Sequence, residues 1–135
     1  KREIIVDYPL SKHYMETDVQ QEIKRGIEEA GRAEAKVLLP IRLEELSRQT
    51  GLRYGKVSVR KTVSRWGSCS ANDDISLSVH LMRLPDHLID YILVHELCHT
   101  VHKNHGPKFH ELLDHHTGGR HRQLEKETKQ FHTRW

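Results

Sequence analysis

The stretch that decides the fold is residues 84–105, which read LPDHLIDYILVHELCHTVHKNH. Apolar residues recur through it every three or four positions, which is the spacing of a helix packed against a core. We therefore expect a helix that opens at Leu84-Pro85-Asp86 and runs to about His102. Asn104-His105-Gly106-Pro107 follows and ends it, because glycine and proline favour turns.

The predicted helix carries the pattern His-Glu-x-x-His at residues 95–99. Two histidines four residues apart lie on one helical face, so His95 and His99 can bind one metal ion together. The break after the helix lets the chain turn back and bring His105 to the same ion. Three ligands leave the fourth tetrahedral position for water, as catalytic zinc requires. Glu96, beside the first ligand, is then placed to act on that water as the general base.

Two duller interpretations compete with this prediction. In the first, His95 and His99 bind no metal and are partly buried helix residues with hydrogen-bonded rings. In the second, the zinc site is closed and purely structural, with Cys98 as the fourth ligand. Cys98 stands three residues from His95 and one from His99, so it points away from the ligand face. The sequence therefore favours Zn²⁺ held by His95, His99 and His105, with Glu96 as the catalytic residue.

Length and composition predict one domain over residues 1–135, with 36% apolar and 30% charged residues. A net charge of +3 falls short of a nucleic-acid-binding tail. No apolar run approaches the roughly 18 residues of a membrane span. Two cysteines make no disulfide framework, which favours a reducing, cytoplasmic location. The chain begins at Lys1 without methionine and shows no signal peptide, which is compatible with a fragment that lacks an upstream domain.

The rest of the chain predicts an α+β fold in which the motif-bearing helix packs against a small mixed sheet. Residues 1–10 suggest a short extended segment. A helical pattern runs from Thr17 to Thr50-Gly51, and Pro40 begins a new helix or kinks a long one there. Alternating apolar and polar residues predict two strands, at residues 56–61 and 75–81. Helical periodicity predicts two further helices, at residues 107–115 and 120–131.

Several separate motifs, in order, resemble the YgjP-like metallopeptidase domain, which is similar to the SprT-like and WLM zinc peptidases. These motifs are Arg65-Trp66-Gly67-Ser68-Cys69-Ser70, Ile75-Ser76-Leu77, Leu84-Pro85, Asp90-Tyr91, His95-Glu96-Leu97-Cys98-His99 and Asn104-His105-Gly106-Pro107-Lys108-Phe109. The resemblance covers about residues 35–112. It implies a zincin-type fold, peptidase activity on peptides or proteins, three histidine zinc ligands and Glu96 as acid-base.

The chain also departs from that family. Its members commonly have Asn where Ser78 stands and Trp where His110 stands, and they tend to carry an upstream domain. In zincins an edge strand above the active-site helix pairs with extended substrate, and the alternation at residues 75–81 fits such a strand. This strand is equally compatible with an ordinary place inside the sheet.

Residues near the motifs have weaker expected roles. Trp66 is expected in the core rather than in a substrate cleft. Arg65 binds a substrate anion or stays on the surface, and Tyr91 supplies a hydroxyl to the site or is a half-buried helix tyrosine. Candidates to support the ligands are His80, His102, Glu111 and Asp114. Histidines expected on the surface are His115, His116, His121 and His132.

Two rival functions remain open from the sequence. The first is a DNA-associated protease of the SprT-like kind, which basic residues at positions 53, 56, 60, 61 and 65 permit. No zinc knuckle or aromatic-basic alternation supports it. The second is a metal-binding interaction module with weak or lost catalysis, against which the intact Glu96 argues.

Overall fold

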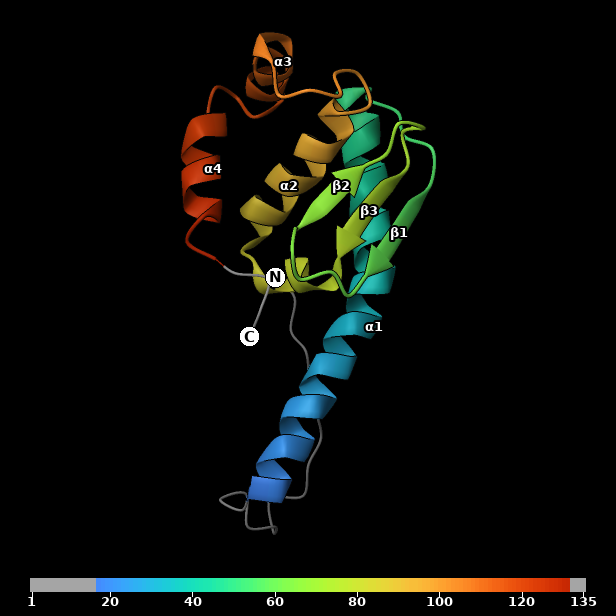
Figure 1. Cartoon of the computed structure of the whole chain (residues 1–135), viewed down its shortest axis with the longest axis vertical. Coiled ribbons are helices and arrows are strands. Elements are labelled where there is room, and N and C mark those ends of the chain that lie inside the picture. The colour runs from blue at the N-terminus through green and yellow to red at the C-terminus, as the bar shows by residue number, and fades with distance from the viewer. Residues whose placement is uncertain (1–16, 132–135) are drawn as a thin grey trace.

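The computed structural model describes residues 17–131, with side chains from Arg32 onward, so the extended segment predicted at residues 1–10 lies outside it. The predicted α+β class is confirmed: helices and a small mixed sheet follow one another along the chain (Figure 1). The elements are α1 (Thr17–Thr50), β1 (Val57–Arg60), β2 (Gly67–Cys69), β3 (Ile75–Ser78), the 3-10 helix η1 (Val79–Arg83), α2 (Asp86–Cys98), α3 (Pro107–His116) and α4 (His121–Thr128).

Helix α1 is one continuous helix through Pro40 and ends where the sequence predicts. Gly51 takes a φ of +77°, a conformation natural to glycine, and donates its N–H to the Ser47 carbonyl at 2.9 Å. One stripe of the helix is buried, formed by Ala35, Leu39, Leu43 and Leu46. That stripe packs α1 against α2, η1 and β1. The helix therefore forms the scaffold behind the rest of the domain.

The sheet has the strand order β1-β3-β2, with β1 parallel and β2 antiparallel to β3. The strand predicted at residues 75–81 is wrong beyond Ser78, where the chain enters η1. The buried Ser78 hydroxyl donates to the Thr62 carbonyl at 2.7 Å and accepts the His80 N–H at 3.1 Å, which caps η1. Because β3 lies in the centre, it has the ordinary place inside the sheet, and the edge-strand role, the other alternative for residues 75–81, is wrong. The edge strand beside α2 is β2, which the sequence analysis did not predict.

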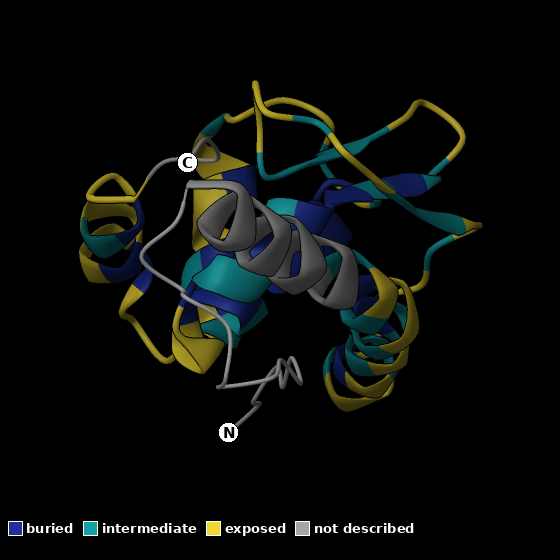
Figure 2. Cartoon of the chain, turned by 90° about the horizontal axis from the view of Figure 1, so that it is seen from below, coloured by how far each residue is buried: buried dark blue, intermediate teal, exposed yellow. Residues whose placement is uncertain are grey.

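Helix α2 is the central element, contacted by α1, β2, α3 and α4. Figure 2 shows buried residues in dark blue where these elements meet. The helix ends at Cys98, four residues before the predicted end, because its last turn tightens. The N–H groups of Thr100 and Val101 reach back only three residues, to Leu97 and Cys98. Helix α4 likewise ends at Thr128 rather than at 131, whereas α3 lies where predicted.

Among the described residues, no helix is both long and apolar enough to cross a membrane.

Candidate active site

Three histidines meet at the C-terminal end of α2. His95 lies in the helix, His99 is its C-cap residue and His105 comes from the loop before α3. One ring nitrogen from each lies within 4.8 Å of the others. The ring centroids are 4.7–5.3 Å apart. The helix break thus brings His105 to the pair on the helix, as its place in the sequence predicts.

The orientation of His99 is fixed by its own backbone neighbourhood. Its Nδ1 lies 3.0 Å from the His102 carbonyl oxygen, which can only accept, so Nδ1 carries the hydrogen. The lone pair is then on Nε2, which lies 2.9 Å from Nε2 of His105. Burial lowers the pKa of both His99 and His105, which keeps the imidazoles neutral. Neutral imidazoles with converging lone pairs are what a metal ion needs.

The ring of Phe109 packs beside all three imidazoles. It is 1% exposed and stacks on His99 at 4.3 Å and 21°. Its centroid also lies 5.1 Å from that of His95 and 4.9 Å from that of His105. A rigid apolar platform restricts the rotamers of the histidines. In the sequence, Phe109 stood out only as the last residue of a motif that contains His105. Its place in that motif was the one indication of this role.

Glu96 is buried beside the histidines, with its side chain 7% exposed and its Oε2 3.3 Å from Nδ1 of His95. Strand β2 passes close over it at Gly67. A Cβ at Gly67 would lie 3.2 Å from Cγ and 3.4 Å from Oε2 of Glu96, and 3.2 Å from the Ser76 carbonyl oxygen. Glycine is therefore needed at this position for close approach rather than for a special φ angle.

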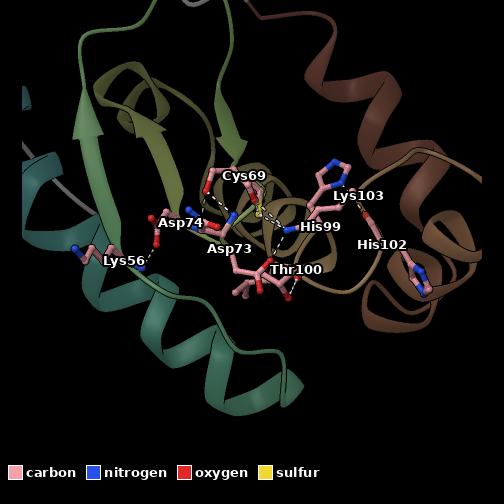
Figure 3. A network of polar contacts seen from close by, with 11 residues as sticks. Lys56, Cys69, Asp73, Asp74, His99, Thr100, His102 and Lys103 are labelled. Carbon is pink, nitrogen blue, oxygen red and sulfur yellow. Dashed lines mark hydrogen bonds and ion pairs between the residues drawn. The ribbon is translucent and has the colours of Figure 1, made fainter.

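A polar clamp joins the loop that carries His105 to the turn between β2 and β3 (Figure 3). The clamp is formed by Lys103, whose Nζ donates to the Ser70 carbonyl at 2.9 Å and pairs with the Asp73 carboxylate. The Cys69 sulfur lies 3.9 Å from the same amine. Asp73 holds a φ of +66° in this turn. The clamp fixes the histidine loop against the hairpin that covers Glu96.

A cavity of about 320 Å³ opens beside His95 and Glu96. Its other lining residues come from β2 and its approach, α2, and α4 with its C-terminal turn: Arg65, Trp66, Gly67, Tyr91, Ile92, Glu125, Thr128, Lys129 and Phe131. Trp66 packs half-buried against the core, as expected, and it also lines the cavity, which was not expected.

Tyr91 lies one turn before His95, with the two ring centroids 6.2 Å apart in an edge-on arrangement. Its side chain also lines the cavity. It is 4% exposed, and burial, together with the negative charge of Glu125, raises the pKa of its hydroxyl to about 12. The hydroxyl therefore stays neutral at physiological pH and can donate a hydrogen bond.

In a comparison with known families, the family model described as YgjP-like, metallopeptidase domain matches residues 3–131. The chain belongs to the YgjP-like family. The match is wider than the residues 35–112 on which the sequence motifs rest. Membership makes this chain a metallopeptidase, a class that hydrolyses peptide bonds in peptides or proteins with the help of a metal ion.

The fold of this YgjP-like chain is similar to a solved structure, the metallopeptidase zymogen of Methanocaldococcus jannaschii jannalysin. The TM-score is 0.59 at 20% sequence identity, and the similarity covers 68% of this chain and 94% of that chain. At this identity it shows a shared fold alone. A search of the curated proteins found no match.

The remaining histidines of the YgjP-like chain correct one expectation. His121, expected on the surface, is 7% exposed, and its Nδ1 has no hydrogen-bond partner among the described residues. Its ring lies 5.1 Å from that of His110. His115 is exposed and His116 is half-buried. His132 lies outside the described residues.

The residues expected to support the ligands lie in three different places. His102 contributes its backbone carbonyl to His99, not its ring. Glu111 and Asp114 line a separate hollow on α3, away from the three histidines. His80 contacts Arg83 within η1. Cys98 is fully buried, and burial raises the pKa of its thiol to about 12, so it packs in the core as expected.

Proposed function

We propose that this chain is a zinc-dependent metallopeptidase in which His95, His99 and His105 hold Zn²⁺ and Glu96 is the general base and acid. The observation that carries the proposal is the convergence of three imidazole nitrogens within 4.8 Å beside a buried carboxylate. Three imidazoles suit zinc, whereas magnesium and calcium prefer oxygen ligands. We treat residues 1–135 as one domain built around this centre.

A bound zinc ion supplies a Lewis acid that lowers the pKa of water and polarises a substrate carbonyl. The protein residues do the rest. Glu96 takes a proton from the attacking water through its carboxylate and passes it to the leaving nitrogen of the peptide. Its burial under Gly67 and its contact with His95 restrict it to one position. The hydrogen bond from His99 to the His102 carbonyl keeps that imidazole correctly oriented.

The substrate backbone is expected along the outer edge of β2, which takes the role that the sequence gave to residues 75–81. Strand β2 pairs with β3 on one side and contacts α2. An extended peptide added to such an edge gains backbone hydrogen bonds. It then runs past Gly67, directly over Glu96.

The test is a comparison of two variants with the parent protein. Glu96→Gln keeps the shape of the side chain but cannot accept a proton, so we expect full zinc binding and a loss of kcat of about 10²-fold or more. His105→Ala should lose zinc and activity together. Metal analysis and cleavage of a peptide library, with and without a chelator, measure both. Zinc retained with unchanged hydrolysis in Glu96→Gln would sink the mechanism. Bound zinc without cleavage of any peptide would leave only the rival function, a metal-binding interaction module.

A further inference from the structure

We propose that the cavity beside His95 and Glu96 is a specificity pocket that takes a large apolar side chain of the peptide, next to the bond that is cleaved. This inference deepens the proposed function and rests on it. The carrying observation is continuity: the same 320 Å³ cavity is lined by His95 and Glu96 and by the apolar side chains of Trp66, Tyr91, Ile92 and Phe131. A peptide bond held over Glu96 therefore places a neighbouring side chain at its mouth.

The interior of the pocket is apolar and prearranged. Tyr91 and Ile92 are 4% and 7% exposed and belong to the buried core, and Trp66 packs against it. Such side chains do not need to be ordered when a ligand enters, which lowers the entropic cost of binding. Aromatic rings add favourable offset or edge-on contacts to an apolar guest. A cavity of this size lies at the small end of ligand sites and suits one side chain.

Apart from Glu96, the charged groups that line the pocket are at its rim and do not favour one sign. Arg65, Glu125 and Lys129 are all exposed. Two cations and one anion around the mouth give no net field that selects an acidic or a basic side chain strongly. Burying a charged side chain among Trp66, Tyr91 and Ile92 would cost its hydration, and Glu96, the buried carboxylate of the lining, already contacts His95. Apolar side chains are therefore the class that the pocket selects.

Among the apolar side chains that line the pocket, Phe131 has the largest exposed fraction for an occupant to cover. It is 37% exposed, whereas the other apolar walls are already covered more fully. Its backbone N–H donates to the Thr128 carbonyl at 3.1 Å, which holds it at the C-terminal turn of α4. An apolar side chain in the pocket would cover its ring and remove that area from water. Its removal should weaken selectivity without disturbing the core.

The experiment uses the fluorescence of Trp66. The chain has two tryptophans, so Trp135→Phe leaves Trp66 as the one reporter, inside the pocket wall. Glu96→Gln is added to prevent hydrolysis. Peptides with acetylated and amidated ends, identical except for Phe, Leu, Ala, Lys or Glu at one position, are titrated against this zinc-loaded protein. Blocked ends remove terminal charges that would bind the rim. We expect the Phe and Leu peptides to shift Trp66 emission and to bind about tenfold tighter than the Ala peptide.

Variants at the wall test the assignment of the pocket. Phe131→Ala should reduce the preference for Phe over Ala to about threefold or less, and Phe131→Leu should keep most of it. Val37→Ala, at an apolar residue of α1 that is 59% exposed, is the matched control and should change nothing. Equal weakening of all peptides by Phe131→Ala would overturn the proposal. Tightest binding of the Lys or Glu peptide would overturn it as well, and this result does not depend on whether a Phe131 variant folds.

Failure of this proposal and failure of the proposed function give different results. Binding is measured in a protein that does not hydrolyse. If the parent cleaves peptides but shows no preference for apolar residues at any position, the pocket is wrong and the peptidase mechanism stands. If Phe peptides bind at Trp66 but the parent cleaves none of them, the mechanism fails and the pocket stands.

Discussion

Gly67 decides how close strand β2 can come to Glu96, the proposed general base. A methyl group there would lie 3.2 Å from both Cγ of Glu96 and the Ser76 carbonyl oxygen, so a neighbour must move by a few tenths of an ångström. The Ser76 carbonyl is held in the sheet, which leaves Glu96 to move. Gly67→Ala should lower kcat by about 10–100-fold with zinc binding retained, because a small misplacement of a catalytic group is costly. Steady-state kinetics and metal analysis measure the two effects.

A matched control exists in the same protein. Gly106→Ala adds the same methyl group where no atom lies within 4 Å and where φ is −83°. It should retain most of the activity. If both alanine variants lose activity equally, the loss would reflect a general sensitivity of the loops rather than crowding of Glu96.

At this scale, spacing in the sequence was enough to bring His95, His99 and His105 together. It was not enough for Gly67 or His121. Gly67 contacts Glu96 across 29 positions of sequence, and no local pattern reports such a contact. His121 was expected on the surface, but it begins α4 on the side facing the core. Burial of a polar residue depends on how helices pack, which periodicity in a short helix does not determine.

Among the elements, the loop between α2 and α3 depends most on a single side chain. Lys103 ties it to Ser70 and Asp73 of the β2–β3 turn, two residues before the proposed ligand His105. Lys103→Ala should raise the dissociation constant for zinc by about tenfold, because outer contacts of this kind orient ligands. Global stability should change by less than about 1 kcal/mol, since the pair is exposed. Competition with a chromophoric chelator measures the affinity.

Lys108→Ala, at an exposed lysine of α3, provides the control for loss of a positive charge. Asp73→Ala should reproduce the effect of Lys103→Ala, and the double variant should add little to either. Unchanged zinc affinity in both single variants would show that the loop is positioned by other contacts.

The elements themselves were predictable in order and type, with two instructive exceptions. Strand β2 is three residues long, too short for alternation to be recognised. Strand β3 stops at Ser78 although the alternation continues to Leu81, because the Ser78 hydroxyl caps η1 and competes with the sheet. Both helices that ended early tighten in their last turn, where backbone N–H groups reach back three residues instead of four, so the chain keeps turning after the α-helix has ended.

At the scale of the whole molecule, an ion pair joins the scaffold helix α1 to α2. Arg42 of α1 donates two hydrogen bonds of 2.8 Å, from Nε and a terminal nitrogen, to the two oxygens of Asp90 in α2. Both side chains are 35% exposed, so solvent screens part of the attraction. Arg42→Ala should lower the free energy of unfolding by about 1 kcal/mol. Arg42→Lys should lose most of the same amount, because lysine cannot form the paired geometry.

Urea unfolding of the three proteins measures these differences. Arg48→Ala is the control, since Arg48 pairs with Glu44 within α1 and is 80% exposed. It should change stability by a few tenths of a kcal/mol at most. A larger loss for Arg48→Ala than for Arg42→Ala would show that the link between the helices contributes little.

The overall α+β arrangement followed from the sequence because its long apolar patterns are local. The helical stripes of α1 and α2 predict two helices that must bury one face each, and alternation predicts strands to cover them. The order β1-β3-β2 did not follow, because the pairing of short strands is settled by contacts between distant residues.

The short length of β2 limits both how much substrate the strand can bind and how readily it pairs with other chains. Three residues of extended chain span about 10 Å. Long open edges recruit further strands and lead to fibrous assemblies, whereas very short ones do not. We expect the same brevity to limit the hold on a substrate to a few residues. A folded protein would then need to loosen only a short loop or a frayed terminus to be cut.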